Sequence, residues 1–318
     1  MNDKTDLPPE VAAPLAPFKG ERPPAPEWFN AAIAEEPERF FVESGGAKIE
    51  CLAWGERGKP GLVFVHGASA HADWWSFIAP FFSKDYRVAA LSLSGMGDSD
   101  WREAYGFDLF DAEVDACARA AGLYESEVLP VYIGHSFGGA VVYVCSLAHP
   151  ERMRATLLLD TGFGPPPKES AAHAAKPDMP QVRMGRIYPS LEAAIARFRL
   201  LPSQAPGNLY IADFIARRSL KRVPMPDGSG MGWTWKFDPN LFPHLDRASL
   251  RALAAREPGP CFHIHGDRSL VFQNFQGRPN LLAASVKNIA VPDSAHHLMI
   301  DQPLALVAAI RATLAHWP

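Results

Sequence analysis

The fold is decided by the stretch Val128-Leu-Pro-Val-Tyr-Ile-Gly134-His135-Ser136-Phe137-Gly138-Gly139-Ala140-Val-Val-Tyr-Val144. An apolar run typical of a buried strand leads into the pattern Gly-x-Ser-x-Gly, and an apolar run typical of a helix follows at once. Glycine at 134 and 138 removes a steric cost in a tight turn, so we expect Ser136 at a sharp corner with its hydroxyl exposed. Because the turn lies between a strand and a helix, it predicts a nucleophilic serine.

A pair of histidines near the C-terminus supplies the base that such a serine needs. A serine hydroxyl is a weak nucleophile near neutral pH, so a neighbouring group must accept its proton. His296 and His297 lie in a short polar loop, after a predicted strand over residues 285–291 and before a predicted C-terminal helix. We interpret His296 as the base and keep His297 as the alternative. Asp301 is interpreted as a helix N-cap, with Pro303 in the first turn.

From about Phe40 to the C-terminus, the chain resembles the α/β-hydrolase superfamily. The predicted strand, tight turn and helix around Ser136, called the elbow below, carry one part of the resemblance. The catalytic histidine of this superfamily commonly follows Gly or Ala and precedes the Asp of an Asp-x-Pro helix start by five residues, and His296 fits this pattern. A third part is the apolar run Gly61-Leu-Val-Phe-Val-His66-Gly67-Ala68, which reads as a buried strand that ends beside the elbow. The resemblance implies the chain order serine, acid, histidine.

The resemblance also implies an oxyanion hole made of main-chain groups. In the superfamily, the backbone N–H of the residue after the His-Gly pair and that of the residue after the serine hold the oxyanion. Here these residues are Ala68 and Phe137. Donors that are fixed before the reaction stabilise the charge of the tetrahedral intermediate. His66 itself is interpreted as a structural hydrogen-bonding residue of this loop.

The acid is the point at which this sequence departs from the superfamily pattern. The acid commonly comes three residues after the glycine that ends the seventh strand, and in Pro260-Cys-Phe-His-Ile-His265-Gly266-Asp267-Arg268-Ser269 that position is a serine. Two carboxylates could substitute for it, Asp267 and Asp160, the latter at the end of the predicted sixth strand. We favour Asp160, because some members carry the acid after that strand, and keep Asp267 as the alternative acid. The chemistry requires only a carboxylate that accepts the imidazole N–H.

The order of predicted elements indicates three regions. Strands are predicted over residues 39–42, 49–54, 62–65 and 86–91, and helices over 109–121 and 139–148, which predicts an α/β-hydrolase fold with a mostly parallel sheet covered by helices on both faces. The core would comprise residues 39–162 and 257–318, with a helical cap over 163–256 inserted after the sixth strand. Residues 1–38 form a Pro-rich N-terminal arm, whose first 26 residues or so are expected to be extended.

Four residues are candidates for contacts with a substrate. A cap in this position would roof the elbow, exclude water and contact the substrate. The loop after the first His-Gly pair should face the same space, so His71 and Trp74 are candidates. Trp233 and Trp235 are candidates from the cap, although both also fit a simple cap core.

Composition excludes several classes of partner. A net charge of −4 and a pI near 6.3 give no basic face for nucleic acid. No apolar run approaches the length of a membrane span, and the N-terminus lacks the apolar stretch of a signal peptide. The scattered cysteines read as buried thiols of a reducing compartment, so we expect a cytoplasmic protein. His263 and His265 lack a third metal ligand with suitable spacing, and we expect no metal and no cofactor. Because the N-terminal arm can pack either on its own domain or on a partner, a homodimer remains an alternative.

These observations together predict a serine hydrolase. We expect it to cleave a carboxylic ester or lactone of a hydrophobic small molecule through an acyl-enzyme, with Ser136 as nucleophile, His296 as base and Asp160 as the acid that orients the imidazole. The elbow does not distinguish this reaction from carbon–carbon bond hydrolysis of a ring-cleavage diketone. A ligand receptor that keeps the fold and turns over negligibly is a further alternative. An epoxide hydrolase or dehalogenase of this fold would need Asp at position 136.

Overall fold

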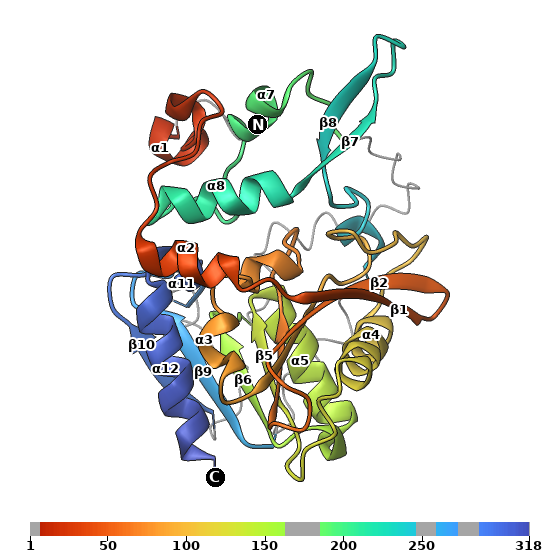
Figure 1. The fold of residues 1–318 in the computed structure, drawn as a ribbon, viewed down its shortest axis with the longest axis vertical. Helices are drawn as coiled ribbons and strands as arrows, with labels where there is room; N and C mark the ends of the chain where they lie inside the picture. The colour runs from red at the N-terminus through yellow and green to blue at the C-terminus, as the bar shows by residue number, and fades with distance from the viewer. Residues whose placement is uncertain (1–6, 163–184, 246–258, 273–285, 318) are drawn as a thin grey trace, which may run out of the picture.

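A central sheet of eight strands organises the molecule (Figure 1). The computed structural model describes residues 7–162, 185–245, 259–272 and 286–317. The two strands at one edge run antiparallel to their neighbours, and the remaining strands pair in parallel, which confirms the predicted α/β-hydrolase fold class. In spatial order the strands are β1 (Glu38–Ser44), β2 (Ala47–Trp54), β4 (Arg87–Leu91), β3 (Gly61–Val65), β5 (Val131–His135), β6 (Ala155–Leu159), β9 (Cys261–Gly266) and β10 (Lys287–Val291).

Helices cover both faces of this sheet and give each face a hydrophobic core. Alternate residues of β3 serve the two sides, because side chains of a strand point to opposite faces. Leu62 and Phe64 pack in the core with α3 and α12, and Val63 and Val65 pack in the core with α4 and α5. The helical elements of the core are η2 (Ala72–Trp75), α3 (Pro80–Ser83), α4 (Phe107–Ala120), α5 (Phe137–Ala148), η3 (Pro150–Arg152), α11 (Leu298–Asp301) and α12 (Pro303–His316).

Residues 185–245 are the described part of the segment predicted as a cap, and they are called the cap below as a name for that segment. They contain a β-hairpin, which is not among the predicted elements. The hairpin turn is built around Asp227, whose Oδ1 accepts hydrogen bonds from the backbone N–H and the hydroxyl of Ser229, and Gly228 has a φ of 74°. The run Pro226-Asp227-Gly228 between two apolar segments is the turn signal in the sequence for this hairpin. The cap elements are α7 (Leu191–Ile195), α8 (Leu209–Arg218), β7 (Leu220–Pro224), β8 (Met231–Trp235) and η4 (Phe242–His244).

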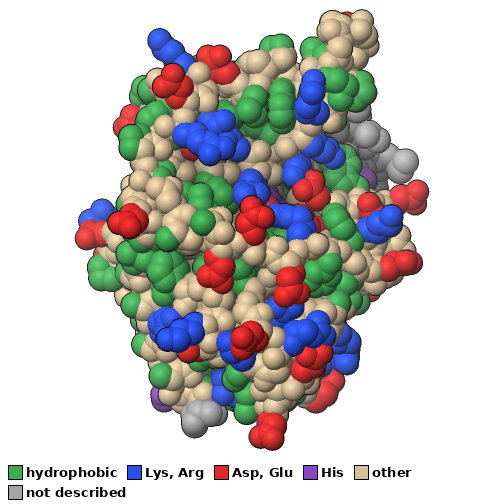
Figure 2. Space-filling view, in the orientation of Figure 1, with side chains coloured by type: hydrophobic (Ala, Val, Ile, Leu, Met, Phe, Trp, Pro, Cys, Tyr) green, Lys and Arg blue, Asp and Glu red, His purple; other side chains and the backbone are tan. Residues whose placement is uncertain are grey.

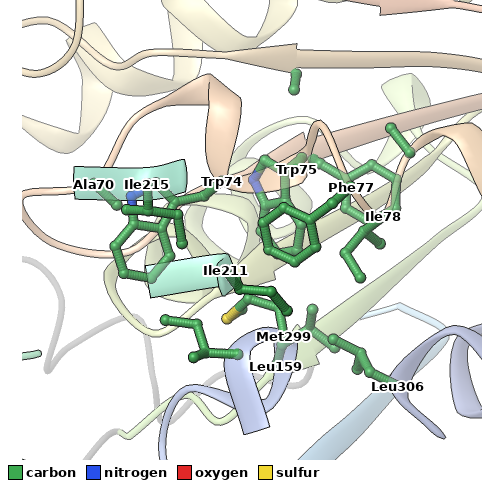
Figure 3. Close-up of a cluster of buried hydrophobic side chains, with 14 of the residues drawn as sticks. Ala70, Trp74, Trp75, Phe77, Ile78, Leu159, Ile211, Ile215, Met299 and Leu306 are labelled. Atoms are coloured by element: carbon green, nitrogen blue, oxygen red, sulfur yellow. The ribbon is translucent and has the colours of Figure 1, made fainter. Parts of the chain in front are cut away.

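Helix α8 packs its apolar face on the core. Ile211 and Ile215 of this helix lie in one hydrophobic cluster with Trp74 of η2 and Met299 of α11 (Figure 3). All four side chains are buried. The cap is therefore joined to the core by apolar packing directly beside the loop that follows β3.

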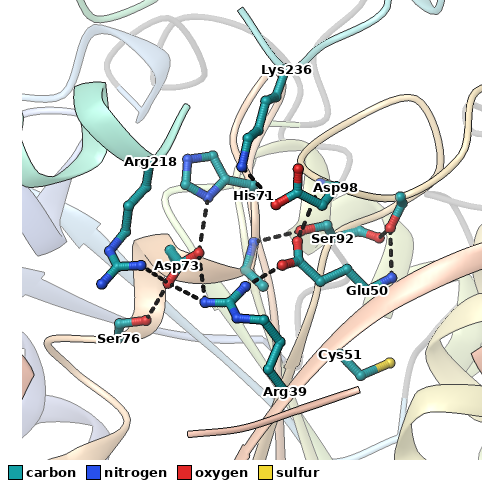
Figure 4. A network of polar contacts seen from close by, with 12 residues as sticks. Arg39, Glu50, Cys51, His71, Asp73, Ser76, Ser92, Asp98, Arg218 and Lys236 are labelled. Atoms are coloured by element: carbon teal, nitrogen blue, oxygen red, sulfur yellow. Dashed lines mark hydrogen bonds and ion pairs between the residues drawn. The ribbon is translucent and has the colours of Figure 1, made fainter. Parts of the chain in front are cut away.

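A polar network joins the same two parts of the molecule (Figure 4). The buried carboxylate of Asp73 in η2 accepts a hydrogen bond from Arg39 of β1 at 3.0 Å and forms an ion pair with Arg218 of α8 at 3.4 Å. The imidazole of His71 lies 2.8 Å from the hydroxyl of Ser219, which directly follows α8. Burying a carboxylate is costly unless it is paired, so these contacts favour one placement of the cap over η2.

The N-terminal arm contains helices, and two short ones fall within about its first 26 residues, where the prediction of an extended segment was wrong. It contains α1 (Pro9–Ala12), η1 (Ala16–Phe18) and α2 (Glu27–Ala34). Pro8 and Pro9 stand at the start of α1 and Pro26 at the start of α2, where the missing N–H costs nothing. Phe29 of α2 is buried, and its ring centroid lies 4.9 Å from that of Tyr210 in α8 and 5.8 Å from that of Phe77 in the core. The arm thus packs across the junction of cap and core.

The outer surface is mixed in charge. Basic and acidic side chains alternate over both the core and the cap on the face drawn in Figure 2. The four cysteines are buried and unpaired. None of the helices in the described residues combines the length and apolar character needed to cross a membrane.

Replacing Phe29 tests whether the arm contributes to stability. Phe29→Ala removes a buried ring between α2, the cap and the core, and we expect the free energy of unfolding to fall by about 3 kcal/mol or more. Urea denaturation followed by tryptophan fluorescence measures this change. Phe41→Ala on β1 is the control, because that ring is 53% exposed and its loss should cost no more than about 0.5 kcal/mol. Equal losses in the two variants would contradict the structural role of the arm.

Candidate active site

The backbone at Ser136 has the geometry of a sharp elbow between β5 and α5. Ser136 has φ 53° and ψ −115°, in a region that residues with a side chain rarely adopt. A Cβ on Gly134 would overlap the carbonyl of Gly138, and a Cβ on Gly138 would overlap the carbonyl of His66. The N–H of Ser136 donates to the carbonyl of Leu159 in the neighbouring strand at 2.9 Å. The two glycines therefore allow the close approach that holds the serine in this conformation.

Three of the predicted side chains form one chain of hydrogen bonds. His296 Nε2 lies 2.9 Å from Ser136 Oγ, and His296 Nδ1 lies 2.9 Å from Asp160 Oδ1. A carboxylate only accepts, so Nδ1 carries the proton and the bare Nε2 accepts from the serine hydroxyl. The imidazole and the carboxylate are both buried. This is the arrangement in which a histidine can take the serine proton while a carboxylate stabilises the imidazolium.

The two alternatives that the sequence left open lie elsewhere. His297 turns toward the cap, where its Nε2 lies 3.2 Å from the carbonyl oxygen of Leu201. Asp267 is exposed, and its Oδ1 accepts from the N–H of Ser294 at 3.2 Å. The geometry thus brings Asp160 and His296 to the serine and leaves Asp267 and His297 out of the chain.

Asp160 accepts hydrogen bonds from residues at the end of β9, which is the strand after which the superfamily commonly has its acid. Its Oδ1 also accepts from the hydroxyl of Ser269 at 2.6 Å, and its Oδ2 accepts from the N–H of Gly266 at 2.9 Å. Burial by itself raises the pKa of Asp160, but the hydrogen bonds from His296, Ser269 and Gly266 outweigh it and lower the pKa below its ordinary value. The sequence analysis did not assign a role to Ser269, although the resemblance had marked its position.

The loop after β3 lies against the elbow. A Cβ on Gly67 would come within 3.4 Å of the Ser136 Cβ. His66 Nε2 accepts from the N–H of Leu93 at 3.0 Å, so His66 Nδ1 donates to the carbonyl of Gly67 at 2.7 Å. Burial lowers the pKa of His66 to about 3, which keeps the ring neutral in this structural position. The loop that contains Ala68 is therefore fixed next to the first turn of α5, which begins at Phe137.

An apolar cavity of about 260 Å³ opens beside the serine. Its lining comes from the N-terminal turns of α4 and α5, from the cap and from the loops after β6 and β9. Apart from the hydroxyl of Ser136, the side chains that line it are hydrocarbon or absent. The described lining residues are Phe107, Ser136, Phe137, Ala140, Gly162, Phe242, Leu245 and Val271.

The four predicted contact residues are not among these lining residues. His71 belongs to the polar network with Ser219, and Trp74 packs in the cluster with α8, its ring 5.6 Å from that of His297. Trp235 packs against Tyr188 and Phe198 inside the cap, and Trp233 lies in the hairpin beneath Arg222. The sequence feature that could have indicated the cavity lining is the apolar face of α5, which begins one turn after Ser136.

The histidines considered as metal ligands have protein partners. His263 Nε2 accepts from the N–H of Thr161 at 3.1 Å, and its Nδ1 lies 2.9 Å from Asn288 Oδ1. The ring of His265 stacks on Phe272 at 3.4 Å. In the described part of the chain, no three His, Cys, Asp or Glu side chains are grouped so as to hold a metal ion.

A mainly parallel sheet with a serine, a histidine and a carboxylate at the carboxyl ends of its strands is the architecture of α/β hydrolases. Residues 62–310 match the model of the alpha/beta hydrolase family, and the chain belongs to this family. Mouse epoxide hydrolase 4 is 30% identical over 122 residues, which are 37% of this chain and 33% of that protein. The match thus spans about a third of that relative's length.

Other similar proteins span more of the chain at lower identity. The pimeloyl-[acyl-carrier protein] methyl ester esterase of Edwardsiella ictaluri is 24% identical over 263 residues, which are 80% of this chain and 92% of that one. Among solved structures, the thioesterase domain from the curacin biosynthetic pathway superposes with a TM-score of 0.66 at 21% identity and covers 86% of this chain and 99% of its own. A novel esterase from Mycobacterium tuberculosis has a TM-score of 0.62 at 22% identity, covering 98% and 100%. These structures share the fold.

The choice of acid can be tested by removing one charge at a time. If Asp160 orients His296, Asp160→Asn should lower the rate of serine acylation by about 10⁴. Asp267→Asn should change it by less than about threefold, because that carboxylate is exposed and contacts neither Ser136 nor His296. Stopped-flow measurement of acylation by an aryl ester reports the difference. The opposite order would place the acid in the loop after β9.

The lowered pKa of Asp160 predicts how stability depends on pH. A carboxyl whose pKa is lower in the folded than in the unfolded state contributes stability above its unfolded pKa, and this stability is lost as the pH falls through the folded pKa. Wild type should therefore exceed Asp160→Asn in unfolding free energy at neutral pH, and the difference should shrink as the pH falls below the ordinary value of 3.8. Urea denaturation of both proteins over a pH series measures it. A difference that grows toward acid would contradict the assigned hydrogen bonds.

Proposed function

We propose that the chain is a serine hydrolase that cleaves a carboxylic ester or lactone of a hydrophobic small molecule. The observation that carries the proposal is the chain of 2.9 Å hydrogen bonds from Ser136 through His296 to Asp160, with the serine facing an apolar cavity. We expect the protein to act in the cytoplasm and without a cofactor.

The reaction proceeds through an acyl-enzyme. Ser136 Oγ attacks the carbonyl carbon while its proton passes to His296 Nε2, and Asp160 stabilises the imidazolium that forms. The N–H groups of Ala68 and Phe137 bind the oxyanion. His296 then gives the proton to the leaving alkoxide as the carbon–oxygen bond breaks. Water attacks the acyl-enzyme by the same route, and the acid and free serine are released.

The cavity supports an apolar substrate of modest size. Its volume of about 260 Å³ is slightly below the roughly 300–1,000 Å³ of pockets for drug-sized ligands. Phe107, Phe137 and Phe242 offer ring surfaces and no charge. We propose that this space receives the apolar acyl group of the ester, because it lies directly beside the hydroxyl that attacks the carbonyl.

Several relatives are named epoxide hydrolases, but the residue at position 136 favours a different reaction for this chain. An epoxide hydrolase of this fold would need a carboxylate nucleophile, whereas position 136 is a serine. A serine that lies 2.9 Å from an imidazole can be activated by proton transfer, which favours attack on an acyl carbon.

A substrate panel with single variants tests the function. We expect wild type to turn over aryl esters or lactones, and Ser136→Ala to lose about 10⁴-fold or more while it stays folded, because one hydroxyl contributes little packing. His296→Ala should be equally severe, and His297→Ala should lose less. Diketones in the same panel test the carbon–carbon alternative, and a burst without turnover would favour a receptor. Ser136→Ala activity within tenfold of wild type would exclude the serine mechanism.

Filling the cavity tests the substrate class. Ala140 lies one turn after the serine in α5 and lines the cavity, so Ala140→Leu should lower kcat/KM for hexanoyl relative to acetyl aryl esters by about tenfold or more. Ala148→Leu is the matched control, because it is on the same helix but exposed. An unchanged chain-length preference in Ala140→Leu would show that the acyl group binds elsewhere.

A further inference from the structure

His135 is a buried side chain at the centre of the site that the proposed mechanism does not use. It is the last residue of β5 and directly precedes Ser136. Its side chain is almost fully buried, and its ring centroid lies 4.9 Å from that of His296. A buried imidazole next to Ser136 in the chain and beside the ring of His296 needs a physical reason, because burying a polar ring costs free energy unless it is hydrogen-bonded.

The hydrogen bond that His135 makes fixes its tautomer. Its Nε2 lies 2.9 Å from the main-chain carbonyl oxygen of His296. A carbonyl oxygen only accepts, so Nε2 carries the proton and donates it. Burial, together with the neighbouring His296, lowers the pKa of His135 to about 3, so the ring stays neutral. Its single N–H is therefore committed to the backbone of His296, and its Nδ1 has no partner among the described residues.

The same ring also lies against the loop after β3. A Cβ on Gly67 would come within 2.8 Å of His135 Nδ1. His135 thus touches the loop that contains Ala68 with one edge and binds the loop that contains His296 with the other. β5 is an interior strand of the sheet and can move little. The side chain of His135 therefore restrains the positions of both loops relative to the sheet.

The loop of His296 is also held from the cap. The backbone N–H of His297 donates to Gln204 Oε1 at 3.2 Å, and the His297 ring bonds the carbonyl of Leu201. Both partners lie in the segment between α7 and α8. These two contacts come from the cap and end on His297. The hydrogen bond from His135 comes instead from the core and ends on the backbone of His296 itself.

We propose that His135 is a positioning residue for the base. Its Nε2–H bond to the His296 carbonyl holds the base so that the imidazole meets Ser136 Oγ and Asp160 Oδ1 at the same time. The inference rests on the proposed serine hydrolase function. It assigns to His135 no contact with the substrate and no proton transfer.

Two substitutions separate the hydrogen bond from the packing of the ring. His135→Phe keeps a planar ring but removes the donor, and His135→Gln keeps an N–H at a similar distance from the backbone. We expect His135→Phe to lower kcat by about 10- to 100-fold with KM within twofold, because small displacements of a catalytic group have large effects on rate. His135→Gln should recover kcat to within about fivefold of wild type, since one donor replaces another. Steady-state kinetics with the best aryl ester measures both.

A spectroscopic readout follows the base directly. The proton in the hydrogen bond between His296 Nδ1 and Asp160 is expected to give a low-field ¹H NMR signal, and recording it needs no substrate. It should broaden or vanish through faster exchange in His135→Phe and persist in His135→Gln. His149→Phe is the control, because it makes the same ring replacement at the C-terminal end of α5, where the imidazole contacts Glu151 and no residue of the site, so both the signal and kcat should stay near those of wild type.

Clear outcomes would overturn the proposal. These are a kcat of His135→Phe within twofold of wild type with the signal intact, or equal losses in the Phe and Gln variants. Should the Phe variant fail to fold, His135→Asn, whose shorter amide cannot reach the carbonyl, takes its place beside His135→Gln. Failure of the proposed function is distinguishable, because it would appear as an active Ser136→Ala, whereas the NMR signal tests the positioning of His296 without turnover.

Discussion

The candidate site depends on strained backbone conformations in the loops at the carboxyl ends of the strands. Among the described residues, five that are not glycine have positive φ, and four of them lie in loops at the carboxyl ends of strands: Ser69 after β3, Ser136 after β5, Asp160 after β6 and Asp293 after β10. Each such conformation costs on the order of 1–3 kcal/mol and persists only where surrounding contacts determine it. The glycine contacts around Ser136 and the hydrogen bonds of Asp160 are those contacts, so the packed sheet maintains the geometry of both residues together.

The proposed acid, Asp160, illustrates that the chemistry requires a carboxylate at the imidazole but not a particular strand to supply it. Asp160 comes from β6, and the β9 loop contributes Ser269 and the N–H of Gly266 as donors to its carboxylate. β6 and β9 are neighbouring parallel strands, so a carboxylate from either can reach the same place. A serine at the usual acid position is then no defect, because its hydroxyl offsets part of the cost of burying the charge.

The sequence predicted the parts of the fold that depend on local pattern. The strand, Gly-x-Ser-x-Gly turn and helix around Ser136 are continuous in the chain, so steric rules alone predict their arrangement. The choice between His296 and His297 could not be made that way, because adjacent residues differ only in which tertiary partner each one meets. The lining of the cavity could not be predicted from local pattern either, because Phe107 and Phe242 lie in segments that are far apart in the sequence and meet only in the folded chain. The arm was misread because proline-rich composition does not say where each proline stands in a helix.

The proposed base, His296, lies where two kinds of restraint meet. On the core side, the hydrogen bond from His135 ends on the backbone of His296, and β5 can move little without disturbing the sheet. On the cap side, Gln204 and Leu201 bind His297, the next residue along the chain. A displacement of the cap would therefore act on the base through one peptide bond, whereas the serine and the acid are held by the sheet. The interactions that join α8 to η2 consequently bear on the geometry of the candidate site, although none of their residues is among the described lining residues of the cavity.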